Sequence, residues 1–330
     1  MFQQKDMESG RDMVSSELIA SLSPDKLKQI RLFCDVAEAN GDHLTLKELI
    51  SLISLNVTES ELSENWGVLD GLKGYSINSG LVTKAKLDGD SGDAEAVAMD
   101  RTNRARRNIQ FSRSFAELCS TISLKVLSIS GSTSYLSVAK DGDLDLFCIM
   151  NKDSLWPSLV KFLLLARIFR LVHRDSPSIC LSYVVDESFA LREFSQPHDG
   201  LFARDAIYSR VLRGEPYYAR LLRSSHWMAE YFPKLYDQRV KQVHEGLKAN
   251  NESSTSRKIA NLFVYIVASS YIRMKSQLLN RRYSREGKLH SSFRTLVGKD
   301  HCIYESVRYL DLRQMYKTLD SIDDVSKKAI

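Results

Sequence analysis

The sequence predicts an α+β protein with a mixed sheet at its centre, and three observations support this fold class. Apolar residues alternate with acidic ones from Asp143 to Phe147, shortly after an apolar run at 124–129, which indicates two neighbouring strands. Capping signals and a hairpin pattern precede these strands, and helical patterns dominate from residue 201 onward. We expect four parts in chain order: a disordered tail (1–15), a helical domain with a hairpin (16–87), a linker, basic helix and sheet core (88–200), and a basic all-helical C-terminal domain (201–330).

The composition is that of an ordinary globular protein. Of the 330 residues, 43% are hydrophobic and 26% are charged. The five cysteines lack the paired spacing of a metal site and follow no secretory signal, so we expect reduced thiols and a cytoplasmic location. The longest apolar stretch, Ile259–Met274, contains Asn261 and Arg273 and is too short to span a bilayer. We therefore expect no membrane partner.

The N-terminal part contains three helix starts and a hairpin. Pro24 occupies the first position of one helix, and Thr45 and Thr58 each open a capping box with a glutamate three residues later. A hairpin pattern follows over 74–82. Three helices followed by a hairpin form the winged-helix arrangement.

The third of these helices is acidic. It carries no Lys or Arg and four acids, at Glu59, Glu61, Glu64 and Asp70. DNA phosphates would repel such a helix, so we interpret this domain as a surface for a protein partner or for packing within the chain, with DNA binding as the alternative. Residues 86–95 then indicate an acidic hinge.

A candidate site follows the apolar run at 124–129. Gly131-Ser132 predicts a turn whose backbone N–H groups and hydroxyl are free to meet a phosphate. Asp143 and Asp145 share one face of the next strand, where two carboxylates persist mainly if a divalent cation neutralises them. This pairing is typical of phosphoryl or nucleotidyl transfer. The alternative is a helix-capping turn followed by an edge strand with two outward aspartates.

Two further segments bear on this site. A helix over 94–122 carries five arginines, which either cover the site or are solvated. A third strand over 178–185 offers Cys180 and Ser182 on its inward face but no acid. Asp186 has the same parity as Ser182, and Asp175 precedes the strand. We expect His198 to be a loop residue and not a ligand.

These residues resemble the minimal nucleotidyltransferase domain of the DNA polymerase β superfamily. More narrowly, they are similar to an uncharacterised prokaryotic family with a winged-helix segment ahead of that domain. The similarity covers roughly residues 20 to 235, and the stretches that carry it are 128–133, 143–149, 155–156, 179–187, 201–206 and 217–227.

The resemblance implies specific roles. Asp143 and Asp145 would hold Mg²⁺ (or Mn²⁺), Gly131 and Ser132 would cradle the phosphates of a nucleoside triphosphate, and an acceptor hydroxyl would attack the α-phosphorus. Active members usually carry a third carboxylate on a later strand. Asp186 is the candidate here, and Asp175 is another candidate substitute. Because no acid stands clearly at that place, the alternative is a catalytically degenerate module that binds nucleotide or RNA, or that docks a protein partner.

The C-terminal part is strongly basic. Residues 201–330 contain 24 Lys or Arg and 13 Asp or Glu, whereas the first 200 contain 22 and 28. Within 257–299, ten basic residues and one acid are interleaved with aromatic residues. Such a segment predicts RNA binding, because phosphates need cations and bases stack on rings. The alternative is a packed helix whose basic face is solvated or covers the triphosphate.

Overall fold

The protein is represented by a computed structural model that describes residues 22–39, 44–55, 57–69, 72–78, 80–84, 92–140, 142–242, 255–288 and 291–328. These residues form two compact units. The first takes in the chain up to Asp100, Phe232–Leu235 and the residues from Met315 on, and the second takes in Arg101–Tyr231 and Tyr236–Gln314. The expected tail at 1–15 and most of the acidic hinge lie outside the described residues.

The first unit contains the three helices and the hairpin that the sequence predicts. Its elements are α2 (Pro24–Ala39), β1 (Leu44–Thr45), α3 (Leu46–Ile53), α4 (Glu59–Asn65), the 3-10 turn Trp66–Val68, β2 (Tyr75–Asn78) and β3 (Leu81–Lys84). Thr45 caps α3, and Thr58 and Glu61 form the expected capping box of α4. The strands form an antiparallel sheet in the order β1-β3-β2.

Later parts of the chain complete this unit. The ring of Phe33 on α2 lies 6.2 Å from that of Phe232 and 5.9 Å from that of Tyr316, on α14 (Val307–Lys328). The backbone N–H of Lys234, in α12 (Pro233–Gln242), donates to Ser54 Oγ at 3.3 Å. The hydrophobic core of the unit therefore draws on segments well beyond the boundary expected at residue 87.

The second unit is built on a six-stranded mixed sheet in the order β7-β4-β5-β6-β9-β8. Its strands are β4 (Leu124–Ile129), β5 (Leu144–Met150), β6 (Ile179–Asp186), β7 (Arg210–Arg213), β8 (Phe293–Val297) and β9 (His301–Ser306). Only β5 and β6 pair in parallel, and the other pairs are antiparallel. The α+β class and the mixed sheet are thus confirmed.

The expectation of an all-helical region over 201–330 was wrong, because β7, β8 and β9 all lie there. The sequence predicts a helix over 203–213 that Gly214 ends, but the structure has α9 (Gly200–Tyr208) followed by β7. Gly214 has a φ of +83°, and a Cβ on it would lie 1.8 Å from the carbonyl oxygen of Lys125. It therefore permits the turn from β7 to α10 (Glu215–Ser224) and does not stop a helix. Apolar runs as short as Val211-Leu212 do not distinguish helix from strand by their period.

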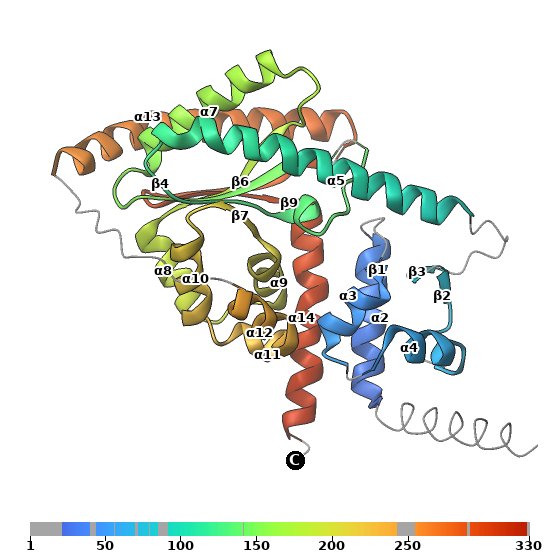
Figure 1. The fold of residues 1–330 in the computed structure, drawn as a ribbon. Coiled ribbons are helices and arrows are strands. Elements are labelled where there is room, and N and C mark those ends of the chain that lie inside the picture. Colours follow the sequence, from blue (N-terminus) through green and yellow to red (C-terminus); the bar gives the residue numbers. More distant parts are fainter. Residues whose placement is uncertain are drawn as a thin grey trace, which may run out of the picture. The chain divides into compact units, whose positions relative to one another are not determined.

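Helices cover both faces of this sheet (Figure 1). Residues 101–118 of α5 (Gly92–Leu118), α7 (Leu155–Val172) and α13 (Thr255–Arg285) lie over one face, and α8 (Glu187–Ser195), α9 and α10 lie over the other. Alternate residues of β5 (Leu144, Leu146, Cys148 and Met150) pack into the core under α5, α7 and α13. The ring of Phe147 points the other way and contacts Phe194 of α8 and Tyr218 of α10. Asp145 has the parity of Phe147 and so faces α8–α10.

Candidate functional site

The turn after β4 lies directly against β5. Ile129 pairs with Leu146, and the N–H of Ser130 donates to the carbonyl of Asp145 at 3.0 Å. Gly131 begins the short helix α6 (Gly131–Ser134) with a φ of +60°. A Cβ on Gly131 would lie 2.6 Å from Asp145 Oδ2, so only glycine allows this approach. The structure therefore brings the Gly131-Ser132 turn and Asp145 together.

Asp143 immediately precedes β5 and Asp145 is its second residue, and the charges of these two carboxylates repel. Burial and the nearby Asp143 carboxylate raise the pKa of Asp145 to about 7, although a hydrogen bond from the Cys180 thiol opposes this shift. The pKa of Asp143 is also raised by burial, against a hydrogen bond from the Ser178 side chain and the positive charge of Arg170. Both carboxylates would gain from a bound cation.

The structure does not bring Asp186 to this site. The residue of β6 that pairs with Asp145 is Cys180, whereas Asp186 pairs with Met150, about 16 Å further along the strand. Asp186 caps α8 by accepting a hydrogen bond from the N–H of Phe189 at 2.9 Å. The expectation of Asp186 as the third carboxylate is therefore corrected.

A β-bulge explains why counting alternate residues along β6 predicted the wrong face for Asp186. Between Asp145 and Phe147 the register of β6 moves from Cys180 to Tyr183, so β6 has one extra residue there. The extra residue reverses the alternation, and Asp186 pairs with Met150, whose side chain packs on the opposite face of the sheet from Asp145. No feature of the sequence marks this bulge.

A third carboxylate approaches Asp145 from α9. Asp205 accepts a hydrogen bond from the Tyr135 hydroxyl, and its charge contributes to the raised pKa of Asp145. Burial raises the pKa of Asp205 to about 6, against the Tyr135 hydrogen bond and the charge of Arg204. The Arg204 guanidinium lies 4.2 Å from the centroid of the Tyr135 ring. Asp205 lies within the family-like stretch 201–206, but its place beside the site could not be predicted, because its partner Tyr135 is seventy residues away in the chain.

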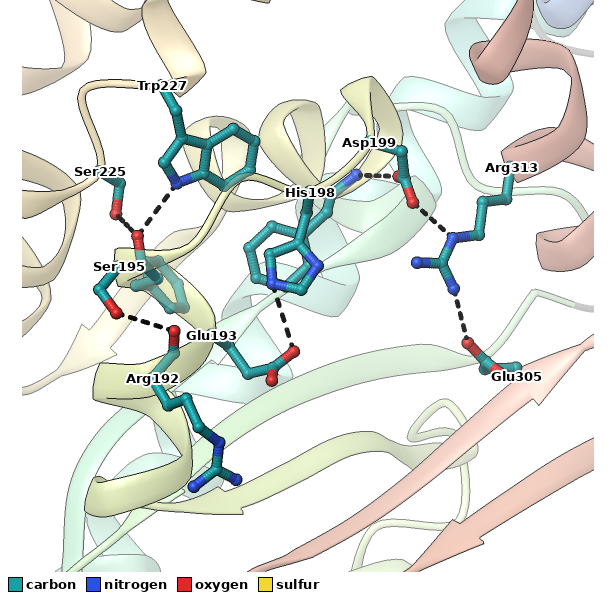
Figure 2. A network of polar contacts seen from close by, with 11 residues as sticks. Arg192, Glu193, Ser195, His198, Asp199, Ser225, Trp227, Glu305 and Arg313 are labelled. Atoms are coloured by element: carbon teal, nitrogen blue, oxygen red, sulfur yellow. Dashed lines mark hydrogen bonds and ion pairs between the residues drawn. The ribbon is translucent and has the colours of Figure 1, made fainter.

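A polar network fixes the start of α9 (Figure 2). Asp199 caps the helix by accepting from the N–H of Phe202 at 3.0 Å, and it also accepts from Arg313 of α14. Arg313 Nη1 donates to Glu305 Oε1 of β9 at 3.2 Å. Figure 2 also shows His198 Nε2 beside Glu193, 3.4 Å away. The network ties the helix that carries Asp205 to the strand β9.

Two arginines of α5 hold the chain that follows α6. Arg101 Nη1 donates to Ser137 Oγ at 3.3 Å, and Arg104 Nε donates to the carbonyl of Val138 at 2.9 Å. The other three arginines of the predicted basic helix (Arg106, Arg107 and Arg113) are exposed. The basic face is thus divided between a structural role and solvent.

Within the described residues, no three His, Cys, Asp or Glu side chains are placed to hold a metal ion together. A cation site here consequently depends on Asp143 and Asp145 with further ligands from a substrate. The described residues likewise contain no helix long and apolar enough to cross a membrane. No protein-family model, curated protein or solved structure matches this chain.

Proposed function

We propose that this site binds a nucleoside triphosphate with Mg²⁺ (or Mn²⁺) and transfers its nucleoside monophosphate to a hydroxyl acceptor. The contact between the Gly131 turn and Asp145 supports the proposal most directly, because it sets backbone N–H groups beside a pair of carboxylates. Phosphate binding and cation binding would then occur within one small region. The family resemblance from the sequence supports the same reaction class.

The residues present fit a divalent cation held jointly by protein and substrate. Carboxylates are the protein ligands that Mg²⁺ prefers, and it commonly uses one or two of them together with substrate phosphates. Asp143 and Asp145 would supply the protein ligands. The cation, when bound, would neutralise charge on the triphosphate.

The other residues of the site would orient the substrates and move a proton. Gly131 lacks a side chain and so lets the turn lie against the Asp145 carboxylate, and Ser132 beside it is partly exposed and offers a hydroxyl. Asp205, whose pKa of about 6 lies near neutrality, is suited to accept the proton of the attacking hydroxyl. The new bond joins the acceptor oxygen to the α-phosphorus, and pyrophosphate leaves.

The test is calorimetry with each of the four ribonucleoside triphosphates, with and without Mg²⁺. We expect the wild-type chain to bind at least one of them only with Mg²⁺, and the double variant Asp143→Asn/Asp145→Asn to lose that binding. Asp237→Asn, which changes an exposed carboxylate of α12, is the matched control and keeps it. Undiminished binding by the double variant contradicts the proposed site.

A second candidate function is a degenerate core that binds nucleotide or RNA without catalysis. Cys180 favours it, because a thiol stands beside Asp145 where active relatives would place an acid. The exposed basic residues of α13 favour an RNA ligand. Binding of a triphosphate without release of pyrophosphate, whichever hydroxyl acceptor is added, would support this function over transfer.

The first unit is proposed as a winged-helix-like module for a protein partner. Its helix α4 exposes Glu59 and Glu64 and carries no basic residue, so DNA phosphates would repel it. A pull-down with the charge-reversed variant Glu59→Lys/Glu64→Lys tests this role, since a partner bound through α4 would be lost.

A further inference from the structure

Helices α7 and α13 carry an apolar surface that points away from the sheet. They pack against each other over the face opposite α8–α10 (Figure 1). On α7, six large apolar side chains between 38% and 75% exposed share the outer face: Val160, Leu163, Leu164, Ile168, Leu171 and Val172. Eight more on α13 are 44% to 70% exposed, with Phe263 the most exposed of them. We call these residues the α7/α13 surface.

Helix α13 is apolar on its outer face as well as on its inner one. Its inner face combines Ile272 of the hydrophobic core with two asparagines: Asn261 accepts from the N–H of Trp156 at 2.9 Å, and Asn280 bonds both the N–H and the carbonyl of Phe293. Outward it presents Ile259, Phe263, Ile266 and other large apolar side chains. A helix apolar on its outer face requires a partner there, because water does not stabilise such a surface.

The extent of this surface exceeds what a monomer normally exposes. Fourteen half-exposed apolar side chains amount to roughly 1,000 Å² of apolar area. The largest apolar patch of a typical monomer covers about 300–600 Å². Isolated exposed residues such as Leu191 on α8 are ordinary, but adjacent rows on two packed helices are not.

The charge of the same helices specifies the kind of partner. Neither helix contains an acid, whereas α7 carries three and α13 carries seven Lys or Arg, all of them exposed. A second copy of this surface would set these cations against each other, at a cost of several kcal/mol. Nucleic acid would match the charge but would not cover aliphatic side chains. An anionic lipid surface matches both properties, because it admits apolar side chains and attracts the cations that flank them.

We infer that the α7/α13 surface binds the face of an anionic lipid membrane, with the two helices in the plane of the interface. Our expectation of no membrane partner depended on the absence of a spanning segment, which interfacial binding does not need. The long stems of Lys and Arg reach the headgroups while the apolar side chains enter the acyl boundary. This inference is independent of the proposed transfer reaction.

The test is flotation of the full chain with vesicles of phosphatidylcholine and phosphatidylglycerol, and with vesicles of phosphatidylcholine alone. We expect binding to the anionic vesicles at least about tenfold stronger than to the neutral ones, and weakened by salt. Leu164→Glu should reduce binding about tenfold, as should Phe263→Glu. Leu191→Glu changes a leucine of matching exposure (50% against 55%) on the other face and should bind as wild type.

Charge is tested separately from apolar area. Arg167→Glu/Lys258→Glu should lower binding to anionic vesicles about tenfold, whereas Lys47→Glu, exposed on α3, should not. Circular dichroism confirms that each variant is folded. Lack of vesicle binding by the wild type overturns the inference, as does a stable dimer that Leu164→Glu dissociates and that floats with neither vesicle.

Discussion

The backbone of Gly131 lies against the carboxylate of Asp145, so that no side chain fits between them. A Cβ on Gly131 would lie 2.6 Å from Asp145 Oδ2, closer than any van der Waals contact allows. The turn also has a φ of +60°, which L-residues with a side chain adopt only with strain. Glycine is needed here for two reasons: it adopts the positive φ without strain, and it leaves room for the Asp145 carboxylate. The second reason makes the position of the turn depend on that carboxylate.

Gly131→Ala should therefore impair ligand binding more than folding. We expect a loss of about 1–3 kcal/mol in the free energy of unfolding and the loss of Mg²⁺-dependent triphosphate binding, because the methyl group displaces Asp145. Calorimetry and thermal unfolding check both effects. Gly287→Ala is the matched control, since its φ is +69° but no atom lies within 4 Å of the added methyl group. Equal nucleotide affinity in the two variants would falsify the role given to this contact.

The raised pKa of Asp145 predicts how the free energy of unfolding depends on pH. Its pKa is about 7 in the folded chain and about 4 when unfolded, so between these values the folded state binds more protons. Stability of the cation-free protein should then fall as pH rises from about 4 to 7, and level off above. Asp145→Asn removes the penalty and should be more stable than wild type by at least about 1 kcal/mol at pH 8, with no such gain at pH 4. Parallel unfolding curves for both proteins across this range would contradict the assignment.

Asp205→Asn should shift the pH dependence of the site. Removing this charge lowers the pKa of Asp145, because one of the groups that raises it is gone. We expect the midpoint of Mg²⁺-dependent triphosphate binding to move to lower pH by about half a unit. Asparagine keeps an acceptor for the Tyr135 hydroxyl, so the fold should be unaffected. Asp237→Asn, on the surface of α12, should leave the midpoint in place.

The sequence predicted the parts of this site that lie close together in the chain. The spacing from Gly131 to Asp145 indicated a turn facing a strand, and the structure brings these two together as expected. Asp205 and Tyr135 could not be predicted, because their contact depends on how α9 packs over the sheet. The strands β8 and β9 were missed for a related reason. Strand β8 pairs with β9, and β9 also pairs with β6, which lies more than a hundred residues earlier in the chain.

Asp186 shows when the alternation of side chains along a strand fails to predict which face a residue occupies. Alternation along a strand predicts the face of a side chain only while the register is unbroken, and the bulge in β6 breaks it. Asp186 is instead the N-cap of α8, where its side chain accepts from the N–H of Phe189.

Two variants of Asp186 distinguish its role as the N-cap of α8 from the expected role as a catalytic carboxylate. As the N-cap of α8, Asp186→Ala should lose about 1 kcal/mol of stability, because the N–H of Phe189 loses its acceptor. Asp186→Asn retains an acceptor and should lose much less. Neither variant should change triphosphate affinity or turnover, since Asp186 lies about 16 Å along the sheet from Asp145 and its carboxylate is engaged in capping α8. If Asp186→Asn were as stable as wild type but inactive, the carboxylate itself would be needed for chemistry, and the assignment of the proton-accepting role to Asp205 would have to be abandoned.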